Sequence, residues 1–275
     1  MIMLSPKLGI PLFRHFYYPK GCDTGFGHRL AVRLNERGFR VYATVISESS
    51  AGAIELPTNA RFPDKMHVLA MDVTRDNHVQ RAYKYIKLHL KEKCHGDYLW
   101  ALVNNAGICN ECPIEWGTEE MYEQVFAVNM FGVIRVTRDF LPLIRASQGR
   151  VVNVSCIMGR ISMSPIGWYC MSKHAVIAFS DTLRREMRSF GVRVVTIEPS
   201  GFRTGITDDR NRFGKICRTW RHTSTHIQKA YGNEYLDGLK EMIIEFNAGF
   251  HLGDNIDIVV NDMIDAIESV EPRLE

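Results

Sequence analysis

The chain has 275 residues and a formal net charge of +3; 45% of its residues are hydrophobic and 24% are charged. This size and balance are typical of one soluble α/β or mixed domain with a sizeable core, and they do not favour a nucleic-acid partner because charges of both signs are interspersed. No apolar run approaches the ~18 residues that a transmembrane helix needs, so we expect none.

The seven cysteines are scattered and form no pattern typical of a disulfide framework. We therefore expect reduced thiols and an intracellular protein, whether cytoplasmic, mitochondrial or membrane-associated. Cys109 and Cys112 form a lone CxxC, and no second pair of Cys or His follows at a suitable spacing. We therefore expect no metal site.

The first predicted element is a glycine-rich turn that leads into a helix. Gly21 to Gly27 (GCDTGFG) precedes a helical apolar stripe between His28 and Arg37. Glycines let the backbone approach a pyrophosphate, and a helix start offers free N–H groups and a partial positive charge. A hydrophobic strand should come before this turn, but residues 11–20 (PLFRHFYYPK) make a poor strand because Pro19 and Lys20 occupy its end.

Hydrophobic runs and helical patterns alternate along the rest of the chain. This alternation predicts an α/β fold with a doubly wound parallel sheet (Rossmann fold), in a single domain over residues 1–275, with ligands at the carboxyl ends of the strands. The expected strands are residues 40–46, 66–73, 98–103, 150–154 and 193–197, and the expected helices are residues 77–92, 118–146, 254–269 and the segment from Gly167 onward.

Small and polar residues follow several of these strands, where a ligand cleft is expected. At the end of strand 40–46, however, the acid for a ribose hydroxyl is either missing or displaced to Glu48, and no Lys or Arg for a 2′-phosphate replaces it. Because no basic residue is present there, we expect NAD as the cofactor, and NADP stays the alternative. The strand-end residues are Asp72, Asn104 to Gly107 (NNAG), Ser155, Cys156, Gly159, and Glu198 to Gly201.

Tyr169 and Lys173 lie four residues apart in GWYCMSKHAV (167–176), a segment with no helix breaker after Pro165. On a helix they share one face. A phenol titrates near ~10 and exchanges protons at neutral pH only if its anion is stabilised, which an ammonium one turn away can do. The spacing therefore suits a tuned acid/base, and the alternative is an exposed aromatic residue beside a solvated lysine.

Residues 204–253 break the alternation of strands and helices. The segment begins with a basic cluster, and residues 225–246 are expected to be helical with an interruption near Gly232. An insertion that overlies the cleft would act as a lid and select the substrate. We favour a solvated helix face for the basic cluster over a phospholipid or anionic-ligand patch, which would imply peripheral membrane association. The cluster contains Arg210, Arg212, Lys215, Arg218 and Arg221.

Four motifs in this order resemble those of the short-chain dehydrogenase/reductase family, over nearly the whole chain from Gly21 to about Pro272. They are GCDTGFG, NNAG, Tyr169-x-x-x-Lys173 and EPSGFRT at 198–204. The connecting segments are similar to the branch of retinol, 17β-hydroxysteroid and D-3-hydroxybutyrate dehydrogenases. The resemblance implies hydride transfer between a nicotinamide cofactor and a small-molecule alcohol or carbonyl. It also implies a homo-oligomer, and a further strand and hydrophobic tail beyond Glu275.

The resemblance also implies roles for single residues. Tyr169 would be the acid/base, Lys173 would lower its pKa and hold the nicotinamide ribose, and Asn129 would keep a water chain to Lys173. The predicted catalytic residues are Tyr169, Lys173, Asn129, Cys156 and Ser155. The predicted cofactor-binding residues are Gly21, Asp23, Gly25, Phe26, Gly27, Asp72, Val73, Asn104, Asn105, Ala106, Gly107, Tyr169, Lys173, Pro199 and Thr204.

Two departures from the family pattern favour an alternative function. Cys156 stands where the family has a serine that donates to the substrate oxygen, and a thiol is a weaker donor. Ser155 cannot simply replace it, because successive strand residues point to opposite faces. Lys20 replaces a threonine before the glycine turn. The alternative is a catalytically impaired relative that binds nucleotide or a hydrophobic ligand, or that serves as a partner subunit.

Overall fold

Six parallel strands form the centre of the molecule in a computed structural model that describes residues 9–13, 25–93, 97–207, 209–249 and 252–273. The strand order is β3-β2-β1-β4-β5-β6, which reverses direction between β1 and β4. This confirms the predicted doubly wound sheet. The strands are β1 Gly9–Phe13, β2 Arg40–Val45, β3 Met66–Ala70, β4 Ala101–Asn104, β5 Arg150–Val154 and β6 Arg193–Ile197.

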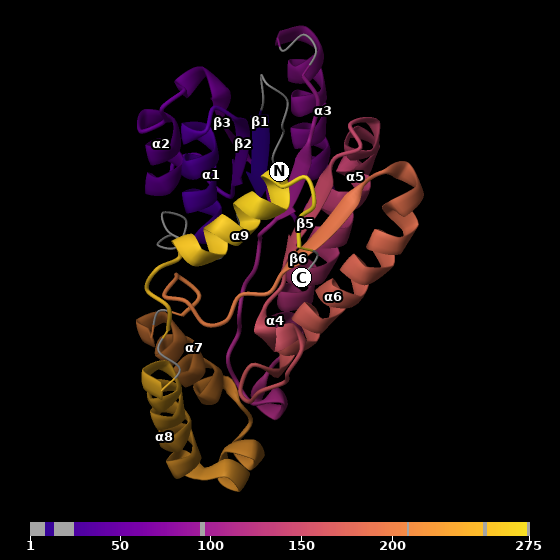
Figure 1. Ribbon diagram of the computed structural model, residues 1–275. Helices are drawn as coiled ribbons and strands as arrows, with labels where there is room; N and C mark the ends of the chain where they lie inside the picture. Colours follow the sequence, from indigo (N-terminus) through magenta and orange to yellow (C-terminus); the bar gives the residue numbers. More distant parts are fainter. Residues whose placement is uncertain (1–8, 14–24, 94–96, 208, 250–251, 274–275) are drawn as a thin grey trace.

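Helices cover both faces of the sheet (Figure 1). None of the helices in the described ranges is both long enough and apolar enough to span a bilayer. On one face are α1 Phe26–Glu36, α2 Ala51–Thr58 and α9 Asp257–Glu268, and on the other α3 Asp76–Lys93, α5 Val133–Ala146 and α6 Gly167–Met187.

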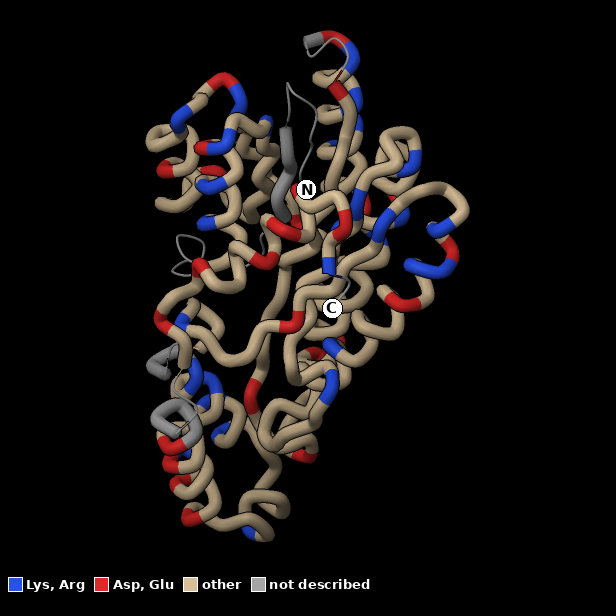
Figure 2. Tube along the Cα trace, in the orientation of Figure 1, with Lys and Arg blue, Asp and Glu red and all other residues tan. Residues whose placement is uncertain are grey.

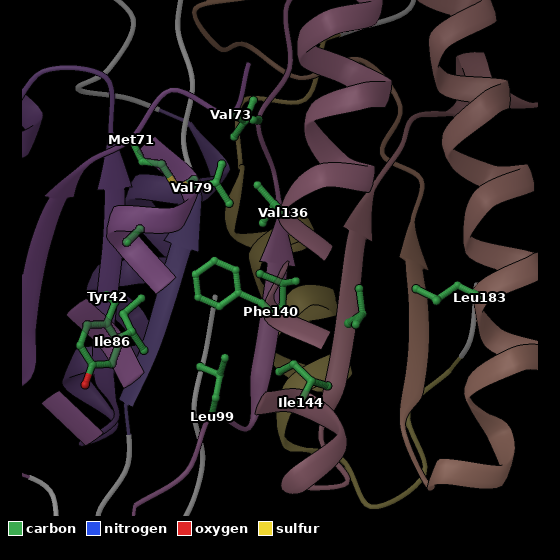
Figure 3. Close-up of a cluster of buried hydrophobic side chains, with 14 of the residues drawn as sticks. Tyr42, Met71, Val73, Val79, Ile86, Leu99, Val136, Phe140, Ile144 and Leu183 are labelled. Carbon is green, nitrogen blue, oxygen red and sulfur yellow. The ribbon is translucent and has the colours of Figure 1, made fainter. Parts of the chain in front are cut away.

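Each face of the sheet has its own hydrophobic core. On the face of α3, α5 and α6, Phe140 of α5 is fully buried beside Ile86 of α3 (Figure 3). On the opposite face, Leu30 of α1 packs in one cluster with Met263 of α9. Burial of these apolar side chains is the main stabilising contribution to the fold.

The strand β1 lies earlier in the chain than expected. It ends at Phe13, and Pro19, Lys20 and the start of the glycine turn lie outside the described residues. Pro11 pairs in register with β2, whereas the pairing of β1 with β4 begins only at Leu12. The proline, which has no N–H to donate, therefore precedes the doubly paired part of the strand.

The expected helix 118–146 is divided into three parts: α4 Glu119–Phe126, a π-helical segment Ala127–Gly132, and α5. Asn129 lies in the π-helical segment, and its amide exchanges two hydrogen bonds of 2.9 Å with the backbone of Ile108. Gly132 packs so closely that an added Cβ would lie 2.5 Å from Val73. The π-helical segment thus lies between the loop that contains Ile108 and the loop that contains Val73. Such segments are common at functional sites.

Two further helices, α7 Asp209–His222 and α8 Thr225–Gly249, lie together at one end of the molecule (Figure 1). Both ends of this insertion are held side by side, since Gly253 donates to Gly201 O at 3.0 Å and Arg203 donates to Gly253 O at 3.1 Å. Gly232 interrupts α8 with a φ of 75°, where we expected an interruption. A third small core joins the two helices to Trp116, whose ring centroid lies 4.5 Å from that of Trp220.

Candidate active site

One cleft brings together residues from the carboxyl ends of β4, β5 and β6, the start of α1, α6 and the insertion. Its empty space, counted together with the open solvent at its mouth, is ≈ 1130 Å³. Of the predicted site residues, those that line the cleft are Gly25, Phe26, Gly27, Asn105, Gly107, Ser155, Cys156, Tyr169, Lys173, Pro199 and Thr204.

The end of the glycine turn lies at the cleft. Gly25 has a φ of 106°, a conformation that side chains rarely adopt, and it precedes α1 as a cap that makes no side-chain hydrogen bond. The first N–H groups of α1 therefore have no side-chain partner from this cap. Gly21 and Asp23, the other predicted residues of the turn, lie outside the described residues.

The NNAG motif presents alternate residues to the cleft. Asn105 and Gly107 line it. Asn104 instead points into the interior, where its amide donates to Thr137 Oγ1 at 2.9 Å and Asn153 Oδ1 at 2.8 Å. Ala106 is buried. The side chain of Asn104, a predicted cofactor-binding residue, thus points away from the cleft, because successive residues of a strand point to opposite faces.

Asp72 and Val73 lie in the turn between β3 and α3. The Asp72 carboxylate accepts hydrogen bonds from the backbone and hydroxyl of Thr74, at 2.9 and 2.6 Å. The carbonyl of Val73 accepts a bond from Arg135 at 2.7 Å. Both residues therefore have structural partners, and neither belongs to the cleft wall.

Tyr169 and Lys173 lie on α6 and face the same cleft, as predicted. The Lys173 ammonium is 5.5 Å from the centre of the Tyr169 ring and donates to Val154 O at 2.9 Å. Gly107 lies close by, since an added Cβ would be 3.6 Å from Lys173 Nζ. Only 4% of the Lys173 surface is exposed, so its charge is buried beside the Tyr169 ring.

The pKa values of this pair differ from our expectation. Burial is the largest influence on Tyr169 and raises its pKa well above the ordinary value of 10, and the neighbouring Cys156 adds to this effect. Burial also lowers the pKa of Lys173 to about 8. The expected lowering of the phenol pKa by the lysine is thus outweighed, because desolvation disfavours a buried phenolate. At neutral pH the phenol holds its proton and is a hydrogen-bond donor.

Asn129 is fully buried behind this pair. Besides its two bonds to Ile108, its amide donates to Ser172 Oγ at 3.0 Å, and the Ser172 hydroxyl donates to Tyr169 O at 2.7 Å. Asn129 therefore connects the segment after NNAG with the backbone of Tyr169. An added Cβ on Gly107 would lie 3.7 Å from its Oδ1, so Asn129 also reaches the surroundings of Lys173.

Cys156 and Ser155 point in opposite directions, as strand alternation predicts. The Cys156 thiol lies close enough to the Tyr169 phenol to raise its pKa, and both residues line the cleft. Ser155 is buried, and its hydroxyl donates to Lys173 O at 3.0 Å. A substrate oxygen beside the phenol would therefore meet the thiol, while the serine supports α6.

Thr204 lies where the chain leaves the sheet for the insertion. Its N–H donates to Thr207 Oγ1 at 2.9 Å, which fixes the turn at the cleft edge. Just before it, the ring of Phe202 meets Phe26 edge-on at 5.7 Å. The start of the insertion thus packs directly against the glycine turn.

Sequence reasoning missed much of the cleft wall. Glu111 and Arg212 both line the cleft and form a buried ion pair, in which Arg212 Nε lies 2.6 and 2.7 Å from the two carboxylate oxygens. Glu111 had no recognisable signal beyond its position between the two cysteines of CxxC. The remaining wall is largely apolar and includes Ile157, Met158, Ile166, Phe202, Ile206 and Leu252.

The residues of the cleft fit a nicotinamide dinucleotide. The glycine at positive φ and the helix start suit a pyrophosphate, and the buried Lys173 and the polar Asn105 are available to ribose hydroxyls. By contrast, within the described ranges no group of three or more His, Cys, Asp or Glu is arranged to hold a metal ion.

Comparisons with known proteins agree with this geometry. A family model described as short chain dehydrogenase matches residues 20–214. Human (Homo sapiens) 17-beta-hydroxysteroid dehydrogenase type 6 is 38% identical over 259 residues, which cover 94% of this chain and 78% of that protein. Mouse (Mus musculus) retinol dehydrogenase 7 is 37% identical over 258 residues, with the same shares of 94% and 78%.

A solved structure is similar as well. It is a short chain dehydrogenase from Burkholderia cenocepacia in complex with NADP, with a TM-score of 0.60 and 25% identity, and the match covers 74% of this chain and 76% of that chain.

Proposed function

Because the chain belongs to the short-chain dehydrogenase family, we propose that its cleft transfers hydride between a nicotinamide cofactor and an apolar alcohol or ketone of the retinoid or steroid type. The chain is an oxidoreductase of CH–OH groups that uses NAD(P). The observation that carries the proposal is that Gly25, Tyr169 and Lys173 line one and the same cleft.

Tyr169 is proposed to exchange a proton with the substrate oxygen. A bound nicotinamide ring supplies or accepts the hydride at the substrate carbon. During reduction the carbon gains hydride and negative charge develops on the oxygen, so the protonated phenol donates to it. The Cys156 thiol, which lines the same cleft, would provide the second hydrogen bond to this oxygen.

Lys173 is proposed to support this proton transfer. When Tyr169 gives up its proton, the ammonium 5.5 Å from its ring stabilises the phenolate that remains. The same ammonium and Asn105 would hold the cofactor ribose, and the start of α1 would hold the pyrophosphate. Asn129 positions α6 and the segment after NNAG relative to one another.

An apolar substrate is supported by the cleft wall and by the names of the relatives. Ile157, Ile206 and Leu252 line the cleft beside Tyr169. Residues 204–253 are proposed as the substrate lid, because their ends are held together at the cleft. Three expectations stay predictions from the sequence: that NAD is the preferred cofactor, that the protein forms a homo-oligomer, and that it associates peripherally with a membrane.

Cofactor binding and turnover test the proposal separately. We expect the fluorescence of NADH or NADPH to change on titration with the protein, and we expect retinal or a ketosteroid to oxidise the bound cofactor. Tyr169→Phe keeps the ring but removes the proton, so kcat should fall by about 10² to 10⁴ while cofactor affinity stays the same. An unchanged kcat in this variant would refute the role of Tyr169.

The alternative function has one supporting observation, which is the thiol at the position of the second donor. If the chain is a binding protein, cofactor fluorescence should respond while every alcohol and ketone tested stays unreacted.

A further inference from the structure

The basic residues of α7 contact the segment that follows NNAG. Arg212 pairs with Glu111 through two short contacts, and Lys215, one turn later on α7, donates to Cys109 O at 3.0 Å. Figure 2 shows Lys and Arg positions gathered along α7. The expectation of a solvated face is therefore wrong for Arg212, of which only 9% is exposed, because its charge is used inside the protein.

The pair lies in the wall of the cleft and not on the outer surface of the lid. Glu111 is 5% exposed, and both residues line the cleft that holds Tyr169. An unpaired guanidinium in such a partly dry wall would attract carboxylates strongly. A carboxylate within 2.7 Å cancels most of that field, so a ligand at this part of the wall meets little of the guanidinium charge.

We propose that Glu111 masks the charge of Arg212 and thereby makes the cleft select uncharged apolar substrates over carboxylates. The pair is thus a specificity-determining element of the lid. This inference rests on the proposed function, because it assigns the pair to the substrate part of the cleft. It also excludes short hydroxy acids as preferred substrates, although an arginine reaches the cleft.

The test compares three probes of equal chain length: decanol, decanoate and decylamine. Their affinities are measured by calorimetry with the full chain at pH 7, both with and without saturating reduced cofactor. The wild-type protein should bind decanol more tightly than decanoate. Glu111→Gln keeps the shape of the side chain but uncovers the guanidinium charge, so decanoate should bind about tenfold more tightly while decanol changes little.

Arg212→Gln gives the opposite change. It leaves the Glu111 charge in the wall, so decanoate should bind about tenfold more weakly and decylamine about tenfold more tightly. Misfolding would weaken all three probes together, so shifts of opposite sign identify the electrostatic effect even if one variant folds poorly.

Glu115→Gln is the matched control. It removes the same charge four residues away, where the carboxylate is exposed and accepts a hydrogen bond from Tyr231 at 2.9 Å. Its ratio of decanoate to decanol affinity should equal that of the wild type. The inference would be overturned if the ratio of decanoate to decanol affinity were the same in the wild type and all three variants. It would also be overturned if Glu115→Gln shifted this ratio as much as Glu111→Gln does. Because the probes are measured by binding, this result stays separate from a failure of turnover or of cofactor binding.

Discussion

Cys156 lies beside the Tyr169 phenol, where a second donor would meet the substrate oxygen. A thiol donates a weaker hydrogen bond than a hydroxyl. Loss of one donor to a developing oxyanion costs about 10² to 10³ in rate, and a weak donor retains part of that effect. The residue therefore limits the rate of the proposed reaction without abolishing it.

Cys156→Ser should consequently increase kcat for ketone reduction by about tenfold or more, with little change in cofactor affinity. Steady-state kinetics with a saturating ketosteroid measure the effect. Cys217→Ser, in the lid, changes the same atom away from the phenol and should leave kcat unchanged. A lower kcat for Cys156→Ser would show that the thiol is not in the donor position.

The helix α9 is held at its C-terminal end by the buried Arg150 and the partly buried Trp100. Arg150 of β5 donates to Ala266 O at 2.9 Å and to Ser269 O, and its guanidinium lies 5.0 Å from the centre of the Trp100 ring. Trp100 itself donates to Ile267 O at 3.0 Å. These bonds satisfy carbonyls that a helix end leaves without intrahelical partners.

Arg150→Met keeps the length of the side chain but removes these donors. We expect the free energy of unfolding to fall by about 2 to 4 kcal/mol, because buried carbonyls lose their charged partner. Urea unfolding followed by circular dichroism measures the change. Arg145→Met on the exposed side of α5 should cost less than about 1 kcal/mol, and equal losses in the two variants would contradict the role of Arg150.

The strands β2 and β3 pack against α3 through a cluster of rings. His67 stacks on Tyr42 at 5.0 Å and lies 4.5 Å from His89, while the Tyr42 hydroxyl is 2.6 Å from His89 Nδ1. The pKa of His67 is lowered to about 4, mainly by burial and then by His89 and Arg40, against the opposing influence of Asp64. The cluster therefore requires a neutral imidazole at position 67.

Protonation of His67 should destabilise this layer in acid. The pKa of His67 is about 6.5 in the unfolded chain and about 4 in the folded one. The stabilising effect of the neutral imidazole is therefore complete above pH 6.5 and is lost as the pH falls toward 4. Because solvent screens the partly exposed ring, we expect the free energy of unfolding to fall by about 1 kcal/mol between pH 7 and pH 5.

Urea titrations at pH 7 and pH 5 check this expectation. His67→Phe retains a stacked ring without a titrating group, so its stability should depend less on pH than that of the wild type. His226→Phe in the lid should retain the wild-type dependence. A dependence on pH that is unchanged in His67→Phe would assign the effect to other groups.

In the part of the chain that the structure describes, two hydrophobic cores share the sheet, and a third core joins the insertion to the segment around Trp116. The third core depends on few large side chains, among which Trp220 packs on Trp116 at 4.5 Å. Small cores of this kind open at a lower free energy than the sheet. We therefore expect the proposed lid to loosen while the rest of the fold stays intact.

Trp220→Ala should loosen the lid selectively. Amides of α7 and α8 are expected to exchange hydrogen faster, whereas those of β5 and α6 keep their protection, because the substitution removes about 3 to 5 kcal/mol of packing from the third core alone. KM for an apolar ketone should rise with unchanged NADH affinity. Hydrogen-exchange mass spectrometry locates the effect, and Ile54→Ala on exposed α2 is the control. Faster exchange throughout the sheet would contradict an independent lid.

The sequence by itself determined the alternation of strands and helices, the parallel sheet and the juxtaposition of Tyr169 with Lys173, because these features depend on periodicity and on spacing within one element. It also predicted the opposite directions of Ser155 and Cys156. The comparisons confirmed the family and the oxidoreductase activity that its motifs implied.

Only the tertiary structure decided what depends on residues far apart in the chain. The raised pKa of Tyr169 comes from burial by several elements, and the inward side chain of Asn104 comes from its partners on β5 and α5. The pairing of Glu111 with Arg212 joins positions a hundred and one residues apart. No local pattern encodes such contacts, because packing selects them from many possible partners once the elements have assembled.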